Sequence, residues 1–112
     1  MPTPHGQDTG GQASRDLPAR VLLGLEIRHA RMARGLSQRE LAHRIGLSAH
    51  SNIVDYELGR RLPPTDIVTA VEKALRVSDH RLRRLHAQAM DERARRRLRD
   101  TELRLGLRTA DP

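Results

Sequence analysis

The segment from Leu36 to Arg61 constrains the fold more than any other part of this chain. It contains Ser37 and, three residues later, Glu40, which form the S-x-x-E pattern of a capping box. In a capping box each of the two side chains binds a free backbone amide at the start of a helix. Apolar residues then recur at helical spacing, and Gly46 stands where a helix would end in a left-handed residue. The pattern predicts a short helix that closes with a glycine turn.

We expect this helix over residues 38–45. A second short helix should start near Ser48 to Ser51, at about Ala49, and run to Glu57. Ile53 and Tyr56 of the second helix are expected to face the core. Two short helices joined by a glycine turn, in a basic chain, are typical of a helix-turn-helix, whose second helix enters the major groove of DNA. The segment 49–57 is therefore the predicted recognition helix.

The chain resembles the phage-repressor/Cro-type (XRE-like) helix-turn-helix family of small prokaryotic DNA-binding domains, over residues 22–85. The matching residues are Gly35-Leu36-Ser37-Gln38, Glu40-Leu41-Ala42, Gly46, Ile53 and Tyr56-Glu57-Leu58-Gly59-Arg60-Arg61. The resemblance implies an all-α fold, a five-helix repressor-like helix-turn-helix domain.

The turn before the recognition helix departs from the family pattern. Gly46 and Ile53 are seven residues apart, whereas the common spacing in the family is six. Counting back from Glu57 keeps the register through His50, so the extra residue falls within 47–49. Either the turn is longer, or the recognition helix begins one residue early.

The resemblance implies a set of residues that read or border the bases. They are His50, Ser51, Asn52 and Asp55. His50 and Ser51 match the two leading base-contact positions of the family, and Asn52 can pair with adenine if it turns inward. The Asp55 carboxylate is repelled by phosphates and directly reads only a cytosine amino group. Its alternative role is to pair with Arg60 or Arg61 and hold that arginine for a phosphate.

A second set is expected at the DNA phosphates: Gln38, Arg39, Arg44, Arg60 and Arg61. Gln38 matches a phosphate-contact position near a helix N-terminus, where free amides and the helix dipole favour an anion. Arg60 and Arg61 fall in a loop where family members contact the DNA backbone. For Arg39 and Arg44 an ordinary solvated charge is the alternative. The resemblance also implies a structural salt bridge between Arg31 and Glu57.

The flanking segments complete the predicted organisation. Residues 1–16 carry almost nothing apolar and are expected to form a disordered arm, followed by a helix over 18–34. The helix-turn-helix domain is expected over 17–89, with its fourth helix at 65–75. An Arg/Leu-rich helical extension and tail would occupy 90–112.

The fifth helix is expected to start near Asp79 and to extend past Arg99. A possible dimer seam along it consists of Leu82, Leu85, Ala94 and Leu98. The early part of the helix is also expected to pack on the domain through Leu82 and Leu85. The leucines beyond Met90 would then form a partner-binding seam or be weakly ordered. The arginine run of this helix has three interpretations. It is a second phosphate-binding strip, a surface for a partner, or a solvated helix face whose positive charge is offset by interleaved acidic residues. The run comprises Arg93, Arg95, Arg96, Arg97 and Arg99.

Composition narrows the function classes. A formal net charge of +7 and a pI of about 11.4 indicate a polyanionic partner, nucleic acid before membrane. Tyr56 is the only aromatic residue, which disfavours a single-strand binder that works by base stacking. The chain has no cysteine, no metal-ligand spacing of histidines and no nucleophile motif, so we expect neither a metal, a cofactor nor an enzyme.

No transmembrane run or signal peptide is evident, and a cytoplasmic, nucleoid-associated location is expected.

These observations favour a sequence-specific, double-stranded-DNA-binding transcriptional regulator. It is expected to act as a homodimer, because one recognition helix is too little for typical specific affinity. Two alternatives remain open: a protein-interaction module, antitoxin-like or a subunit of a larger assembly, and a non-specific nucleic-acid binder that uses the arginine-rich C-terminal helix. No membrane partner and no small-molecule ligand are predicted.

Overall fold

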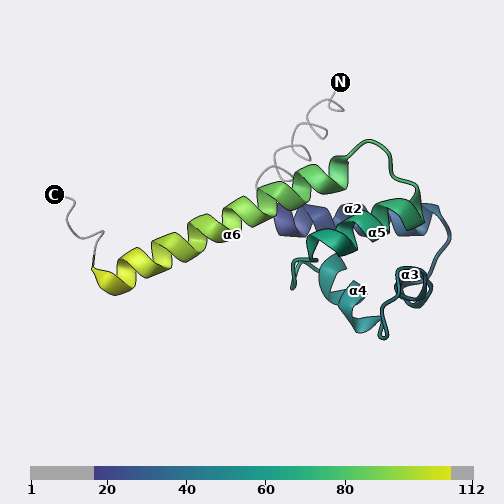
Figure 1. Ribbon diagram of the computed structural model, residues 1–112, viewed down its shortest axis with the longest axis horizontal. Coiled ribbons are helices and arrows are strands. Elements are labelled where there is room, and N and C mark those ends of the chain that lie inside the picture. The colour runs from purple at the N-terminus through teal and green to yellow at the C-terminus, as the bar shows by residue number, and fades with distance from the viewer. Residues whose placement is uncertain (1–16, 107–112) are drawn as a thin grey trace, which may run out of the picture.

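The computed structural model describes residues 17–106, which form five helices and no strand (Figure 1). The helices are α2 (Ala19–Ala33), α3 (Gln38–Arg44), α4 (Ser51–Glu57), α5 (Thr65–Leu75) and α6 (Arg81–Leu105). This is the all-α, five-helix arrangement that the sequence predicts. The expected N-terminal arm, residues 1–16, and the tail at 107–112 lie outside the described residues.

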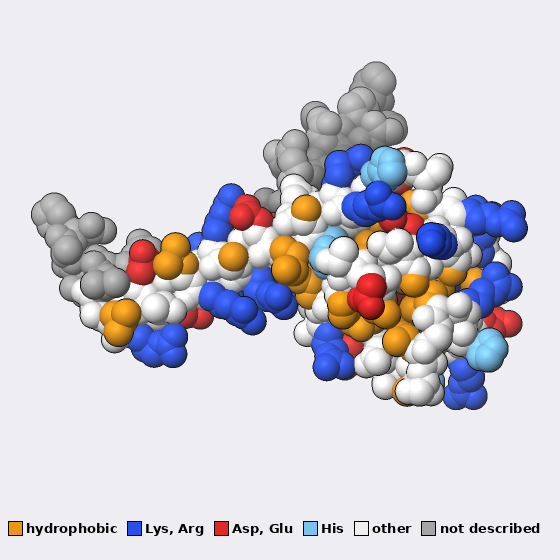
Figure 2. Space-filling view, viewed as in Figure 1, with side chains coloured by type: hydrophobic (Ala, Val, Ile, Leu, Met, Phe, Trp, Pro, Cys, Tyr) orange, Lys and Arg blue, Asp and Glu red, His pale blue; other side chains and the backbone are white. Residues whose placement is uncertain are grey.

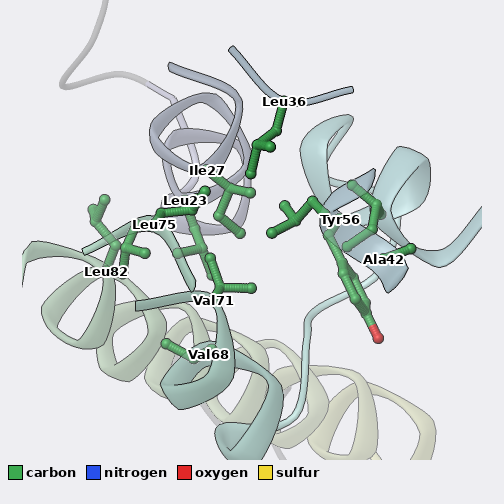
Figure 3. Close-up of a cluster of buried hydrophobic side chains, with 12 residues drawn as sticks. Leu23, Ile27, Leu36, Ala42, Tyr56, Val68, Val71, Leu75 and Leu82 are labelled. Atoms are coloured by element: carbon green, nitrogen blue, oxygen red, sulfur yellow. The ribbon is translucent and has the colours of Figure 1, made fainter. Parts of the chain in front are cut away.

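One apolar core holds the helices together, and Figure 3 shows most of it. Its least exposed large side chains come from all five helices: Leu23 and Ile27 of α2, Leu41 of α3, Ile53 of α4, Val71 and Leu75 of α5, and Leu82 of α6. Burying a side chain of this size stabilises the fold by about 1.5–3 kcal/mol. The helical spacing of these residues therefore fixes which face of each helix turns inward.

The predicted capping box starts α3. The Ser37 hydroxyl accepts a hydrogen bond from the Glu40 backbone amide at 3.0 Å, and the Ser37 backbone amide donates to Glu40 Oε1 at 2.7 Å. The Ser37 backbone amide, which donates to the Glu40 carboxylate, lowers the pKa of this carboxyl, and the Ser37 side chain lowers it further. Both bonds satisfy groups that a helix start otherwise leaves free.

The glycine turn after α3 also forms as predicted. Gly46 has a φ of 82° and donates its amide to the His43 carbonyl at 3.2 Å. The Leu47 amide donates to the Ala42 carbonyl at 2.9 Å, which completes a Schellman motif. The Leu47 side chain packs against the core, so the chain direction is set before the recognition helix begins.

The start of the recognition helix falls within the expected range Ser48 to Ser51, two residues after its approximate position at Ala49. The helix begins at Ser51, after His50, whose side chain makes no capping hydrogen bond. Residues 45–50 form the connection between α3 and α4. Of the two alternatives that the spacing left open, the structure has the longer turn, because the Schellman motif already uses the chain through Leu47.

The long helix α6 packs against α2 and then continues beyond the domain (Figure 1). Arg81 pairs with Glu26 at 3.1 Å near one end of the contact, and Glu92 Oε1 accepts the Ala19 amide at 2.9 Å near the other. The last buried residue of α6 is Ala89. The second half of α6 therefore presents most of its side chains to solvent.

Candidate nucleic-acid interface

The recognition helix α4 has one buried face and one surface face. Ile53 and Tyr56 are buried, as predicted, and Glu57 joins them at the helix end. The four residues predicted to read bases lie on or beside the other face. Ser51 is exposed and the other three are partly exposed: His50, Asn52 and Asp55. The candidate reading surface is thus polar and carries no arginine or lysine of its own.

A buried ionic network fixes α4 to the two preceding helices. Arg31 of α2 donates from Nε to Glu57 Oε2 at 2.6 Å and from Nη2 to Oε1 at 3.0 Å. The two side chains are only 11% and 3% exposed, so a two-point ion pair forms largely out of water. Arg31 Nη1 also donates to the Leu36 carbonyl at 2.8 Å. The structure thus joins the two residues that the family resemblance pairs.

Gln38 belongs to the same network. Its side-chain amide donates to Glu57 Oε1 at 2.9 Å. The resemblance assigned Gln38 to a phosphate, whereas in the structure this amide serves the buried carboxylate. Its remaining N–H donor, together with the free backbone amides at the start of α3, is left for an anion.

The polar face of α4 is tied to the loop that follows the helix. Arg60 Nη1 lies 3.9 Å from Asp55 Oδ1, and Arg61 Nη1 donates to Asn52 Oδ1 at 2.9 Å. The Asp55 contact is one of the two pairings that sequence reasoning proposed. The Asn52 contact is one it missed, because it depends on how the loop folds back along the helix.

The Asn52–Arg61 bond has a chemical consequence. Two-point recognition of adenine uses both the oxygen and the amide of an asparagine. In the structure the Asn52 oxygen already accepts from Arg61. Asn52 could therefore pair with adenine in this way either through the second lone pair of this oxygen or after it releases Arg61.

The two arginines predicted on α3 lie at its surface. Arg39 and Arg44 are both exposed. Neither side chain forms a hydrogen bond or a salt bridge with another residue in the range 17–106. Both are therefore available to solvent or to a ligand.

A glycine contact that the sequence pattern did not reveal positions α4 against α2. A Cβ atom on Gly24 would lie 2.5 Å from the carbonyl oxygens of both Tyr56 and Glu57. The end of α4 therefore approaches the α2 backbone more closely than any other residue allows. The sequence offered one indication of this contact. Glycine inside a helix costs about 1 kcal/mol relative to alanine, so a glycine within the predicted helix 18–34 can mark a close approach of another backbone.

Of the four residues of the possible dimer seam, Leu82 and Leu85 pack on the domain, as also expected, and are not available for a seam. Leu82 and Leu85 are 1% and 6% exposed and belong to the domain core, because they cover α2 and α5 of the same chain. Ala94 and Leu98 are exposed, Leu98 by 60%. A seam on α6 can therefore use only its second half.

Residues 17–106 show no feature of a metal site or of a membrane span. No group of histidine, aspartate and glutamate side chains in that range could hold a metal ion. None of the helices there is both long and apolar enough to cross a membrane. His86 is buried, with its Nε2 2.8 Å from the Pro63 carbonyl oxygen, which gives it a structural role.

Comparison with known proteins agrees with this geometry. A family described as "Helix-turn-helix domain" matches residues 22–85. Among solved structures, the chain is similar to the clp gene regulator ClgR from Corynebacterium glutamicum, with a TM-score of 0.53 and 23% identity. The match covers 84% of this chain and 95% of that one, and at this identity it shows a common fold. No curated protein sequence matches the chain significantly.

Proposed function

The chain belongs to the helix-turn-helix domain family, and on that premise we propose that it is a sequence-specific, double-stranded-DNA-binding transcriptional regulator. The observation that carries the proposal is the surface face of α4. It is polar, it is held in place by the buried Arg31–Glu57 pair, and the arginine loop follows it directly. ClgR, which has a similar fold, is a clp gene regulator, and this supports the same class of function. Within the family, the motif residues favour the phage-repressor/Cro type.

In the proposed complex, α4 lies in the major groove. His50 and Ser51 are at the leading end of the helix, where a recognition helix contacts base edges. An imidazole can donate to guanine, and a hydroxyl can donate or accept. Asn52 and Asp55 border this surface and orient Arg61 and Arg60 respectively.

The phosphate contacts flank the helix on both sides. Arg39 and Arg44 of α3 are on one side, and the loop arginines Arg60 and Arg61 are on the other. These contacts fix the position of the protein on the duplex and supply affinity that is independent of base sequence. Because α4 itself has no arginine or lysine, its flanks must provide this electrostatic contribution.

We also propose that the protein binds as a homodimer. A single recognition helix reads one half-site, and two-fold dimers reach typical specific affinity on inverted repeats. The proposed division of labour assigns DNA binding to residues 17–89 and self-association to 90–112. The exposed apolar residues Ala94, Leu98 and Leu105 are the proposed seam.

Selection of bound sequences from a random duplex pool, at two salt concentrations, tests this function. We expect an inverted-repeat motif that survives the higher salt. If no motif is recovered and binding is lost as salt rises, the protein is a non-specific nucleic-acid binder. If no DNA binding occurs at either salt concentration, the α4 face serves a protein partner instead.

A further inference from the structure

We propose that the arginine groove, a hollow between α6 and the loop after α4, binds the sugar–phosphate backbone of the DNA duplex. It is lined by five arginines: Arg20, Arg60, Arg61, Arg93 and Arg96. This inference rests on the proposed function and extends it, because it assigns a DNA contact to α6, outside the helix-turn-helix.

Three segments far apart in the sequence build the groove. The start of α2 contributes Arg20, the loop after α4 contributes Arg60 and Arg61, and α6 contributes Arg93 and Arg96. Figure 2 shows Lys and Arg side chains gathered on α6 where it leaves the domain. The hollow has a volume of about 810 Å³, in the upper part of the range of about 300–1,000 Å³ for ligand sites. It therefore has room for more than a single small anion.

The charges of Arg93 and Arg96 are not neutralised by the acidic residues beside them in sequence. Asp91 pairs with Arg95 at 2.7 Å, and Glu92 accepts the Ala19 amide. Among residues 17–106, neither Arg93 nor Arg96 forms a salt bridge with a carboxylate. The contact found for Arg93 is with the Met90 sulfur at 3.7 Å. The offset expected from the interleaved sequence is therefore limited, in the groove, to the single carboxylate of Glu92.

Glu92 is the one carboxylate that lines the groove, against five arginines. Positive side chains gathered in a concave surface repel one another and concentrate counterions. When a basic surface neutralises the phosphates of DNA, condensed counterions are released, and this release is the main source of its affinity for DNA. Phosphates in the groove would therefore reduce the repulsion among its arginines and release counterions from the DNA.

The position of the groove indicates which polyanion fills it. Arg60 and Arg61 line the groove and also belong to the loop proposed to contact phosphates beside α4. A duplex bound by α4 therefore brings its backbone to the edge of the groove. Arg93 and Arg96 then continue the line of contacts along the same strand.

A second copy of this chain is a poor occupant. Two copies that meet at this groove would oppose arginines with arginines. Three exposed apolar side chains of α6 also lie elsewhere, whereas Leu103, seven residues beyond Arg96, falls on the side of Arg96. At about 100° per residue, Ala94, Leu98 and Leu105 fall about 160–200° around the helix from Arg96. One face of α6 is thus left for self-association and the opposite face for DNA.

The test compares two double variants that remove the same charge from α6. Arg93→Gln/Arg96→Gln empties the groove of its α6 arginines. Arg95→Gln/Arg99→Gln is the control, because neither of its residues lines the groove and both fall on the side of α6 away from Arg93. The dissociation constant for the selected duplex is measured over a salt series, and thermal unfolding and sedimentation check that fold and assembly are unchanged.

We expect the groove variant to select the same motif as the natural protein but to bind it more weakly. The slope of log K against log salt should fall by about 1.8, which is about 0.9 for each lost phosphate contact. The control should keep the natural slope. Arg93→Lys/Arg96→Lys should restore the slope, because it keeps both charges.

The outcomes separate this inference from the proposed function. If the natural protein selects a motif and the groove variant keeps its salt slope, the groove does not bind DNA and the proposed function stands. A control that loses as much slope as the groove variant would also overturn the groove contact, because the loss would then reflect total charge alone. If the natural protein selects no motif, the proposed function is wrong, and the groove contact that rests on it is overturned with it.

Discussion

At the scale of single residues, the arrangement of the site depends on one buried carboxylate. Glu57 accepts hydrogen bonds from Arg31 and Gln38, which come from the two helices before it in the chain. Motif resemblance was sufficient to pair Arg31 with Glu57, because both positions are fixed by the spacing of the motif. The Gln38 contact could not be predicted in that way, since the same amide could equally have faced solvent.

The first prediction concerns this pair. Arg31→Met should lower the free energy of unfolding by about 3–5 kcal/mol, because it leaves the Glu57 carboxylate buried without its charged partner. Urea denaturation measures the loss. Arg28→Met is the matched control, and since Arg28 is exposed it should change stability by less than about 0.5 kcal/mol. Equal effects of the two changes would contradict a stabilising role for the pair.

The second prediction concerns Gly24. In an ordinary helix, alanine in place of glycine stabilises by about 1 kcal/mol. Here the added Cβ would meet two backbone carbonyl oxygens at 2.5 Å, and neither can move without shifting α4. We therefore expect Gly24→Ala to destabilise the domain by about 1–3 kcal/mol, measured by thermal unfolding. A higher melting temperature would show that α2 and α4 separate without cost.

At the scale of the elements, the sequence was most informative where local rules decide the structure. The capping box, the glycine turn and the bounds of α5 all depend on neighbouring residues, and all were predicted. The start of α4 was predicted only to within the range 48–51, because no side chain caps it and the local pattern does not show how many residues follow the Schellman motif before helical hydrogen bonding resumes.

The part of α6 that is left for a seam depends on what covers its apolar face. Periodicity shows that a helix has an apolar face, but it does not show what covers that face. Leu82 and Leu85 are covered by their own domain, whereas Leu98, 13 residues further along α6 than Leu85, is not. The arginine groove was hidden for the same reason, since its residues come from three segments and meet only when the chain folds.

The third prediction concerns the loop after α4. Arg60→Ala/Arg61→Ala should weaken binding to all duplexes and lower the salt slope by about 1.8, because two phosphate contacts are lost. Salt-dependent binding to a specific and a random duplex measures this. Arg28→Ala/Lys73→Ala removes the same charge from exposed positions outside the proposed interface and is the control. An unchanged slope in the loop variant would reject the proposed docking of α4.

At the scale of the whole molecule, a small domain carries a helix that is longer than the domain needs. The core ends at Ala89, yet α6 continues to Leu105. A lone helix of this kind gains little from the burial of its own side chains, because most tertiary packing stops where the domain ends. Its second half is therefore best explained by contacts with other molecules, DNA on the arginine face and a second copy on the apolar face.

The last prediction tests the apolar face. Leu98 and Leu105 are 60% and 67% exposed and fall on the same side of α6. If they form the centre of a dimer seam, Leu98→Glu/Leu105→Glu should raise the dimer dissociation constant by about 30-fold or more, the effect of losing one interface hot spot of about 2 kcal/mol. Analytical ultracentrifugation over a concentration series measures this constant.

The control for this prediction places two glutamates on exposed apolar positions of α2. Leu25→Glu/Met32→Glu adds the same charge where no seam is proposed, so the dimer should persist. The seam variant should also select single half-sites in place of an inverted repeat, because each monomer then binds alone. A monomeric natural protein, or a seam variant that dimerises as tightly as the control, would show that the second half of α6 does not mediate self-association.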